Sequence, residues 1–286
     1  MVALARSLMS GSASAYLYDY LEQAGEEEYY RLTEGRARAL SLLGRVAAWG
    51  VVGYAMAWHV TLPYWLTTIA AAIALVISSR FPEGRLVETV PTFAGCWRVL
   101  RSTPRLWVMM GAGLAVFVLA RMVQVNLFQP ILGAKGLTVE SFGLIMGFTT
   151  LLEAGGSAWA EPVADRLGEM RSMIWLSLIM AGGTACLPGV DWVGAIFLMS
   201  VFALACGLAY PIQRKLLNDA IPEPSLRATL LSVESLLDRL VCSGMAASVA
   251  LFVGWGRMDL VLQLAGGLTM LVTAALLYAY SKVARQ

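Results

Sequence analysis

Apolar residues in this chain gather into blocks of about 20 residues, and most charged residues lie between the blocks. The hydrocarbon core of a bilayer is about 30 Å thick, so a helix needs about 20 apolar residues to cross it. A helix also satisfies its own backbone polar groups, as lipid requires. The blocks lack the alternation that is typical of membrane β-barrel strands. The pattern therefore predicts an all-α polytopic membrane protein.

The blocks predict nine transmembrane helices, joined by short turns at some points and by long charged loops at others. In the longest loop, Pro91–Leu100 is predicted to form an amphipathic helix along the membrane surface. The predicted spans are Val2–Leu21, Leu40–His59, Leu62–Ser79, Leu106–Leu127, Phe142–Ala160, Ile174–Val190, Trp192–Tyr210, Leu226–Gly254 and Met258–Tyr280.

Composition argues against several other classes of protein. The formal net charge is only +2, and no basic tract is interleaved with aromatic residues, so we expect no nucleic-acid partner. A single histidine and four scattered cysteines lack metal-ligand spacing, so we expect no metal and no cofactor. The sequence carries no H-E-x-x-H and no G-x-S-x-G motif, so we do not expect an enzyme.

The distribution of lysine and arginine predicts the orientation of the spans. Only Lys135 and Arg257 fall in the loops of one side, and four arginines fall within spans. The rest of the 21 basic residues fall in the loops of the other side, which the positive-inside rule assigns to the cytoplasm. We therefore expect a multi-pass protein of a bacterial-type cell membrane, with its C-terminus in the cytoplasm.

Several segments resemble one family, the major facilitator superfamily of secondary transporters. The segment Ala164-Asp165-Arg166-Leu167-Gly168 resembles the D-R-x-G signature of its cytoplasmic loops. The segment from Arg6 to Ala15 is similar to the fourth helix of the family. Arg227–Ser232 resembles the start of the eleventh, and Ser102–Pro104 resembles the lead into the seventh.

The resemblance implies a domain organisation. Residues 1–80 correspond to the last three helices of the N-terminal half, and residues 81–105 to the cytoplasmic linker. Residues 106–281 correspond to the complete C-terminal six-helix half, and residues 282–286 to a cytoplasmic tail. On this alignment the first three helices of the family are missing. The second span also lacks the Gly-Pro pair of the antiporter signature.

Polar residues inside the spans are candidates for a transport cavity, since a charged side chain costs about 2.5–3.5 kcal/mol at the bilayer centre. On the first span, Arg6, Ser10 and Ser14 share one helix face. On the fourth span, Arg121 and Gln124 lie close together. Each set either lines a cavity or makes static hydrogen bonds to a neighbouring helix.

Three carboxylates and one further arginine complete the candidate cavity. Glu153 lies on a small polar face of the fifth span and is our candidate for proton coupling, the alternative being a static ion pair with Arg121 or Arg6. On the eighth span, Glu234 and Asp238 share a face and adjoin Arg239.

The cluster on the eighth span has two interpretations. It is either a gate or coupling network, or a structural salt-bridge cluster between the two halves.

Asp165, Arg166 and Gly168 are the candidate cytoplasmic gate. We expect Asp165 to lie near the start of the eighth span, where the helix dipole favours a carboxylate. The resemblance implies that such a contact holds the cytoplasmic side closed. The alternative is that the basic residues of this loop only anchor the orientation.

The leading hypothesis is a secondary transporter that moves a small organic solute across the bilayer by alternating access. Drug-export-like activity and proton coupling are options within it, and we expect a monomer if the chain is full length. The alternative is a truncated or vestigial membrane protein without transport activity.

Overall fold

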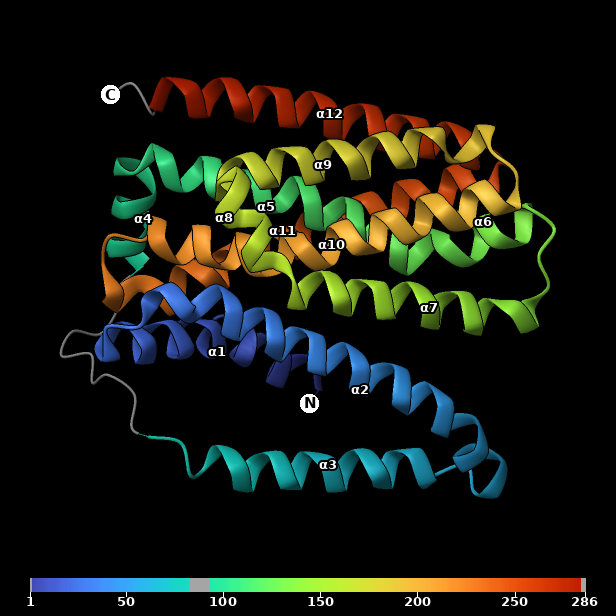
Figure 1. The fold of residues 1–286 in the computed structure, drawn as a ribbon, viewed down its shortest axis with the longest axis horizontal. Helices are drawn as coiled ribbons and strands as arrows, with labels where there is room; N and C mark the ends of the chain where they lie inside the picture. The colour runs from blue at the N-terminus through green and yellow to red at the C-terminus, as the bar shows by residue number, and fades with distance from the viewer. Residues whose placement is uncertain (1, 83–92, 284–286) are drawn as a thin grey trace.

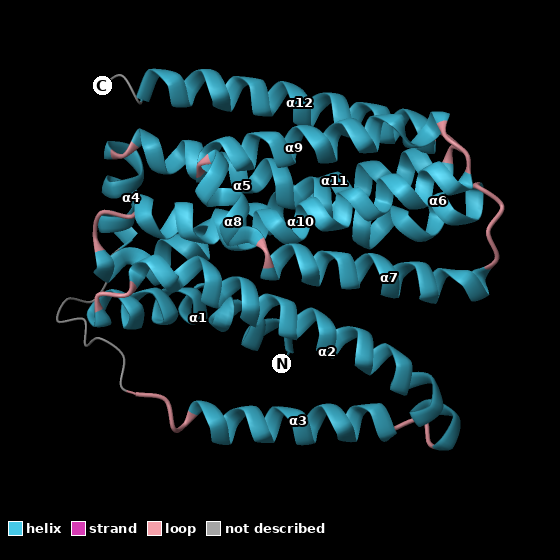
Figure 2. Cartoon of the chain, in the orientation of Figure 1, coloured by secondary structure: helices cyan, strands magenta, loops and turns pink. Residues whose placement is uncertain are grey.

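The computed structural model describes residues 2–82 and 93–283, and their regular structure is helical throughout (Figures 1 and 2). The α-helices are α1 (Val2–Ala24), α2 (Tyr30–Trp58), α3 (Leu62–Ser78), α4 (Phe93–Ser102), α5 (Pro104–Ala120), α6 (Phe128–Ala134), α7 (Val139–Ala158), α8 (Ala160–Leu167), α9 (Glu169–Cys186), α10 (Trp192–Ala220), α11 (Arg227–Gly254) and α12 (Met258–Val283). A π-helical segment, η2 (Arg121–Leu127), joins α5 to α6, and short 3₁₀ turns are η1 (Glu27–Tyr29), η3 (Leu187–Gly189) and η4 (Pro224–Leu226).

The predicted spans fall in helical segments of the chain, and the all-α polytopic architecture is confirmed. Within the described residues, five helical segments are long and apolar enough to cross a membrane. They are Pro104–Ala134, Glu169–Gly189, Trp192–Ala220, Pro224–Gly254 and Met258–Lys282.

The outward faces of these helices are apolar, which is what contact with lipid requires. Only 11% of the most apolar stretch of Pro224–Gly254 is buried inside the protein. Large side chains such as Leu144 and Leu271 are exposed on other helices. A water-soluble protein rarely leaves such continuous apolar surface uncovered. These surfaces therefore lie against the hydrocarbon of the bilayer.

The interior of the bundle is formed mainly by α5, α7, α9, α10 and α12, with α2 packed on α7 and α1 packed on α11. Figure 1 shows α3 apart from the bundle, joined to α2 by a short turn. No residue of α3 is buried in the described structure. The C-terminal end of α12 and α4 lie at the same end of the bundle (Figure 1).

Two of the predicted boundaries are wrong by several turns. The segment between the first two spans is largely helix: the chain turns at Gly25, where φ is +71°, and α2 already begins at Tyr30. The seventh predicted span ends at Tyr210, whereas α10 continues to Ala220. In both places the charged residues remain helical because acidic groups of neighbouring helices pair with them.

The predicted surface helix is present as α4, and its residues 91 and 92 lie outside the described part. One face packs on the bundle through Cys96, Val99 and Leu100, while Trp97 is exposed. The indole nitrogen of Trp107 donates a hydrogen bond to the carbonyl of Leu100 and fixes α4 to α5. This two-faced arrangement matches an amphipathic helix.

The crossing of α7 and α10 is held by a hydrogen bond that replaces a missing backbone donor. Pro211 lies inside α10 and has no N–H to offer the carbonyl of Gly207, four residues earlier. The Ser157 hydroxyl of α7 donates to that carbonyl at 2.9 Å instead. Gly207 and Gly156 make the approach possible, since a Cβ at either would collide with the backbone of the other helix.

We predict that Ser157→Ala destabilises the protein by about 1–3 kcal/mol, because the buried Gly207 carbonyl loses its donor. Adding Pro211→Ala returns a backbone N–H, so Ser157→Ala should cost markedly less in that background. Thermal unfolding of the purified variants in detergent measures both effects.

Ser200→Ala is the matched control, since that hydroxyl also donates within α10, to the carbonyl of Ile196. That carbonyl already has its helical N–H partner, so the loss should be small. If Ser157→Ala lowers the stability equally with and without Pro211, the Ser157 hydroxyl does not replace the missing N–H donor.

Candidate functional site

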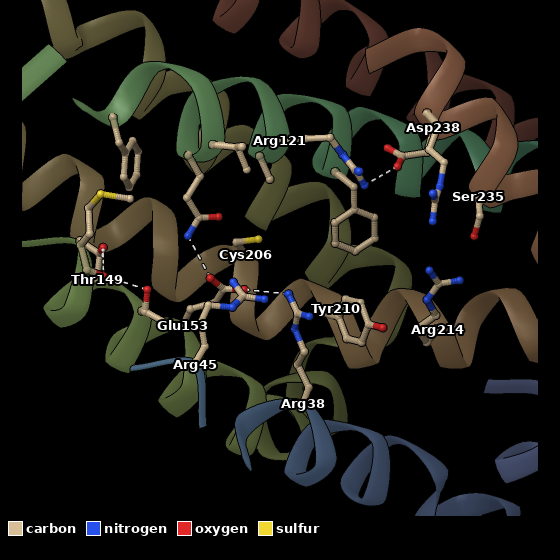
Figure 3. Close-up of a pocket in the computed structure, with 18 of the residues that line it drawn as sticks. Arg38, Arg45, Arg121, Thr149, Glu153, Cys206, Tyr210, Arg214, Ser235 and Asp238 are labelled. Carbon is tan, nitrogen blue, oxygen red and sulfur yellow. Dashed lines mark hydrogen bonds and ion pairs between the residues drawn. The ribbon is translucent and has the colours of Figure 1, made fainter. Parts of the chain in front are cut away.

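A cavity of about 660 Å³ lies between α2, α5, η2, α7, α10 and α11 (Figure 3). Its volume is in the range typical of sites for small organic molecules. The polar and charged residues that line it are Arg38, Arg45, Arg121, Gln124, Thr149, Thr150, Glu153, Tyr210, Arg214, Glu234, Ser235, Asp238 and Arg239.

The structure brings together nearly all the residues predicted to form a cavity. Six of the predicted residues lie on its wall: Arg121 and Gln124 of η2, Glu153 of α7, and Glu234, Asp238 and Arg239 of α11. Arg6 is part of α1, but its side chain is outside the described part of the structure. Ser14 lies elsewhere, in a hydrogen bond with the Tyr30 hydroxyl at 2.6 Å.

Glu153 is almost completely buried and has two partners in the described structure. Its carboxylate accepts hydrogen bonds from Arg38 at 3.0 Å and from Gln124 at 2.9 Å. The sequence suggested Arg121 or Arg6 as the ionic partner, and the partner is instead Arg38 of α2. This ion pair joins α2 to α7 across the cavity wall (Figure 3).

The two carboxylates of α11 each have a different arginine partner. Arg121 pairs with Asp238 at 2.5 Å, and Arg214 pairs with Glu234 at 3.2 Å. Both arginines belong to segments within residues 106–281, so these pairs do not join the two expected halves. Arg214 also interacts electrostatically with Glu34 of α2, so both interpretations of this cluster, as a gate or coupling network and as salt bridges between the halves, stay predictions.

The π-helical segment η2 directs two of its side chains to partners on different helices. Arg121 reaches Asp238 on α11, whereas Gln124 reaches Glu153 on α7. The Asn126 amide turns back and donates to the carbonyl of Arg121 at 3.0 Å. Wide turns of this kind occur often at functional sites, because they re-aim side chains that a regular helix would place differently.

Tyr210 is the aromatic centre of the cavity, and two guanidinium groups lie over its ring. The Cζ atoms of Arg38 and Arg214 are 4.5 Å and 5.6 Å from the ring centroid. The negative face of an aromatic ring attracts such cations. Tyr210 therefore holds the arginines of α2 and α10 beside each other despite their like charge.

The cavity wall also contains residues that were not predicted from the sequence: Arg38, Arg45 and Trp49 of α2, and Tyr210 and Arg214 of α10. The signal was present: residues 38, 45 and 49 share one helix face, as do residues 210 and 214. The predicted second span starts at Leu40 and therefore leaves out Arg38. The predicted seventh span ends at Tyr210 and therefore leaves out Arg214. Arg38 and Arg214 were therefore assigned to cytoplasmic loops.

The predicted gate residues lie at the α8–α9 turn. Asp165 forms an ion pair with Arg31 of α2, and Arg31 also binds Glu169 at 2.7 Å. The sequence predicted that Asp165 contacts the start of α11, whereas its partner in the structure is Arg31 of α2. Arg166 is exposed, and Gly168 makes the turn with φ of +81°.

The start of α11 is occupied by acidic residues of α1 instead. Arg227, the first residue of α11, forms ion pairs with Asp19 and Glu22. The Tyr18 hydroxyl donates to Asp219 of α10 at 2.5 Å. Together with the Arg31 pairs, these contacts tie α1 and α2 to α8, α9, α10 and α11 at one end of the bundle.

A second cavity, of about 820 Å³, lies beside the first and is mostly apolar. It is bounded by α2, α6 and α7, and it shares Trp49 and Met146 with the first cavity. Gly143 and Gly147 of α7 line it, and a Cβ at either position would meet open space. The charged cavity thus has an apolar neighbour.

The four cysteines are free thiols, and no group of metal-ligating side chains was found among the described residues. Cys206 lines the charged cavity. Cys96 lies on the face of α4 that packs against the bundle, and burial raises the pKa of its thiol.

A family model of the Major Facilitator Superfamily matches residues 1–243 of the chain. The chain belongs to the Major Facilitator Superfamily. It is therefore a membrane transporter of the major facilitator type, a class that acts on small-molecule substrates in the lipid bilayer. A search of curated proteins found no match.

We predict that Arg38→Gln destabilises the protein by about 3 kcal/mol, because it leaves the buried Glu153 carboxylate without its cation. The double variant Arg38→Gln with Glu153→Gln should recover much of this loss. Unfolding temperatures of the two single variants and the double variant measure the coupling energy between Arg38 and Glu153.

Arg45→Gln is the matched control, since Arg45 lies on the same helix and the same cavity without a carboxylate partner among the described residues. It should change the stability little. Additive losses in the double variant would show that the Arg38–Glu153 pair contributes no coupling energy.

Proposed function

We propose that this protein moves a small organic solute across the membrane by alternating access, with the charged cavity as its binding site. The observation that carries the proposal is the convergence of eight arginine, aspartate and glutamate side chains from several helices on one cavity inside an apolar bundle. Charged groups within a membrane are costly, so they are retained where they serve a substrate or ion pathway. The substrate would replace part of the network as it binds.

Glu153 is the proposed coupling residue for protons. Its carboxylate faces the cavity and is held by Arg38 and Gln124 from two different segments. A movement of α2 relative to α7 would separate it from Arg38 and leave this buried carboxylate without its cation. The same movement would alter the cavity wall, so proton binding and substrate binding are linked.

The ion pairs of Arg31 and Arg227 are the proposed gate. They join α1 and α2 to α8, α9 and α11 at one end of the bundle, with Asp165 as one partner. In this proposal Gly168 shapes the turn that presents Asp165 and Glu169 to Arg31. Breaking these pairs opens that end, which the distribution of basic residues assigns to the cytoplasm.

Counterflow in liposomes tests the transport function. Purified protein is reconstituted into liposomes that contain a radiolabelled sugar, an aromatic carboxylate or an organic amine, and exchange with external solute is followed. We expect exchange of at least one class. The variant Ser235→Trp should abolish it by filling the cavity, whereas Ser248→Trp, on the exposed side of α11, should not.

Glu153→Gln tests the coupling in the same liposomes. Exchange at equal pH should persist, whereas accumulation driven by a pH gradient should disappear. Absence of exchange of all three classes by a folded wild-type protein would contradict the proposed transport function. Gradient-driven accumulation by Glu153→Gln would contradict the role of Glu153 alone.

For the gate, we predict that Arg31→Gln increases the accessibility of Cys206 to a membrane-impermeant maleimide. Loss of about 1 kcal/mol of closing energy changes the open population about fivefold. The measurement uses a background in which Cys96, Cys186 and Cys242 are alanine. Arg36→Gln, an exposed residue of the same helix, is the control, and equal labelling rates of the two variants would overturn the gate.

A further inference from the structure

The charges on the wall of the cavity do not balance. Five arginines and three carboxylates line it. Arg38, Arg121 and Arg214 each pair with one of the carboxylates, which leaves Arg45 and Arg239. Neither of these two has a carboxylate partner among the described residues.

Glu34 lies just beyond the cavity and does not remove this excess. It interacts electrostatically with Arg214 and Arg38, which already have acidic partners in the cavity. Two guanidinium groups at Arg45 and Arg239 therefore remain available to a ligand. An unpaired cation in a partly enclosed cavity favours an anionic ligand, and the planar guanidinium suits a carboxylate, sulfonate or phosphate group.

The apolar cavity beside the charged one adds a second requirement for the ligand. The two cavities adjoin at Trp49 and Met146, which line both of them. Apart from Gln129, the second cavity is lined by apolar residues, and it opens to the lipid-facing surface, because Leu144, Phe148 and Leu151 are exposed. Gly143 and Gly147 leave open space where side chains would otherwise stand. An apolar ring system or alkyl chain suits this volume.

We propose that the ligand of this protein is an amphiphilic organic anion, whose acidic group binds at one of the two arginines, Arg45 of α2 or Arg239 of α11, and whose apolar body lies against Gly143 and Gly147. This inference rests on the proposed function, because it assigns a substrate class to the same cavity. Trp49 offers aromatic surface where the two cavities adjoin. A free organic acid and an anionic lipid share this chemistry.

The test compares three ligands with one apolar body: 1-naphthoate, 1-naphthylmethanol and 1-naphthylmethylammonium. Binding to the protein in nanodiscs of zwitterionic lipid is measured by isothermal titration calorimetry. We expect 1-naphthoate to bind at least about tenfold more tightly than the other two ligands. Equal or tighter binding of the ammonium compound would overturn the proposal.

Variants of the two free arginines test the position of the acidic group. One of the two variants, Arg45→Gln or Arg239→Gln, should weaken the binding of 1-naphthoate by about fivefold or more, with little effect on 1-naphthylmethanol. Arg36→Gln is the control for the loss of one positive charge outside the cavity. Unchanged affinity in both cavity variants would overturn the assignment of the anion site.

A variant of α7 tests the position of the apolar body. Gly147→Leu should weaken 1-naphthoate by about tenfold and leave the weaker binding of acetate unchanged, because only the larger ligand reaches the second cavity. Gly155→Leu is the matched control: it lies on the same helix, has open space around it, and lines neither cavity. Equal effects of the two leucines would overturn this part of the proposal.

Two further comparisons separate the possible outcomes. If phosphatidylglycerol in the nanodisc displaces 1-naphthoate, the proposed chemistry holds and the source is a lipid; if it does not, the source is a free organic acid. Exchange of only the neutral or cationic solute in liposomes would overturn the anionic class and leave transport intact. Tight binding of 1-naphthoate without exchange of any solute would support the ligand class and contradict the transport function.

Discussion

The need of every buried charge for a partner governs this bundle. In lipid, neither water nor solvent ions can satisfy a guanidinium or a carboxylate, so each must find its complement on another helix. Glu153 binds Arg38, Asp238 binds Arg121 and Glu234 binds Arg214. These pairs fix how α2, η2, α7, α10 and α11 face one another. The same pairs leave a polar cavity between the helices, so the contacts that hold the site together also create it.

Backbone groups follow the same rule at the centre of the bundle. Pro211 removes one helical donor, and the Ser157 hydroxyl of the neighbouring helix supplies another. Gly156 and Gly207 let the two backbones approach closely enough for that bond. The close crossing places Glu153 and Tyr210 on adjoining walls of the cavity (Figure 3). Small residues and one hydroxyl therefore position the charged groups indirectly.

The sequence allowed good prediction of which residues are chemically unusual and poor prediction of their partners. Glu153, Asp238 and Arg121 stood out because a charge inside an apolar block has few explanations. Arg38 and Arg214 did not, since a charge beyond the edge of a block is ordinarily a loop residue. Only the folded chain shows that α2 and α10 continue past those edges, and that Asp165 meets Arg31 rather than the start of α11.

The sequence by itself determined the class of this protein, because the length of its apolar blocks is set by the thickness of a bilayer and the D-R-x-G loop carries a family pattern. It also determined most of the candidate cavity, since polar residues at helical spacing share a face whatever that face meets. The tertiary structure alone decided which charges of the cavity wall form ion pairs and which, namely Arg45 and Arg239, have no carboxylate partner among the described residues. Ion pairing depends on distances between helices that are far apart in the chain, and no local pattern encodes those distances.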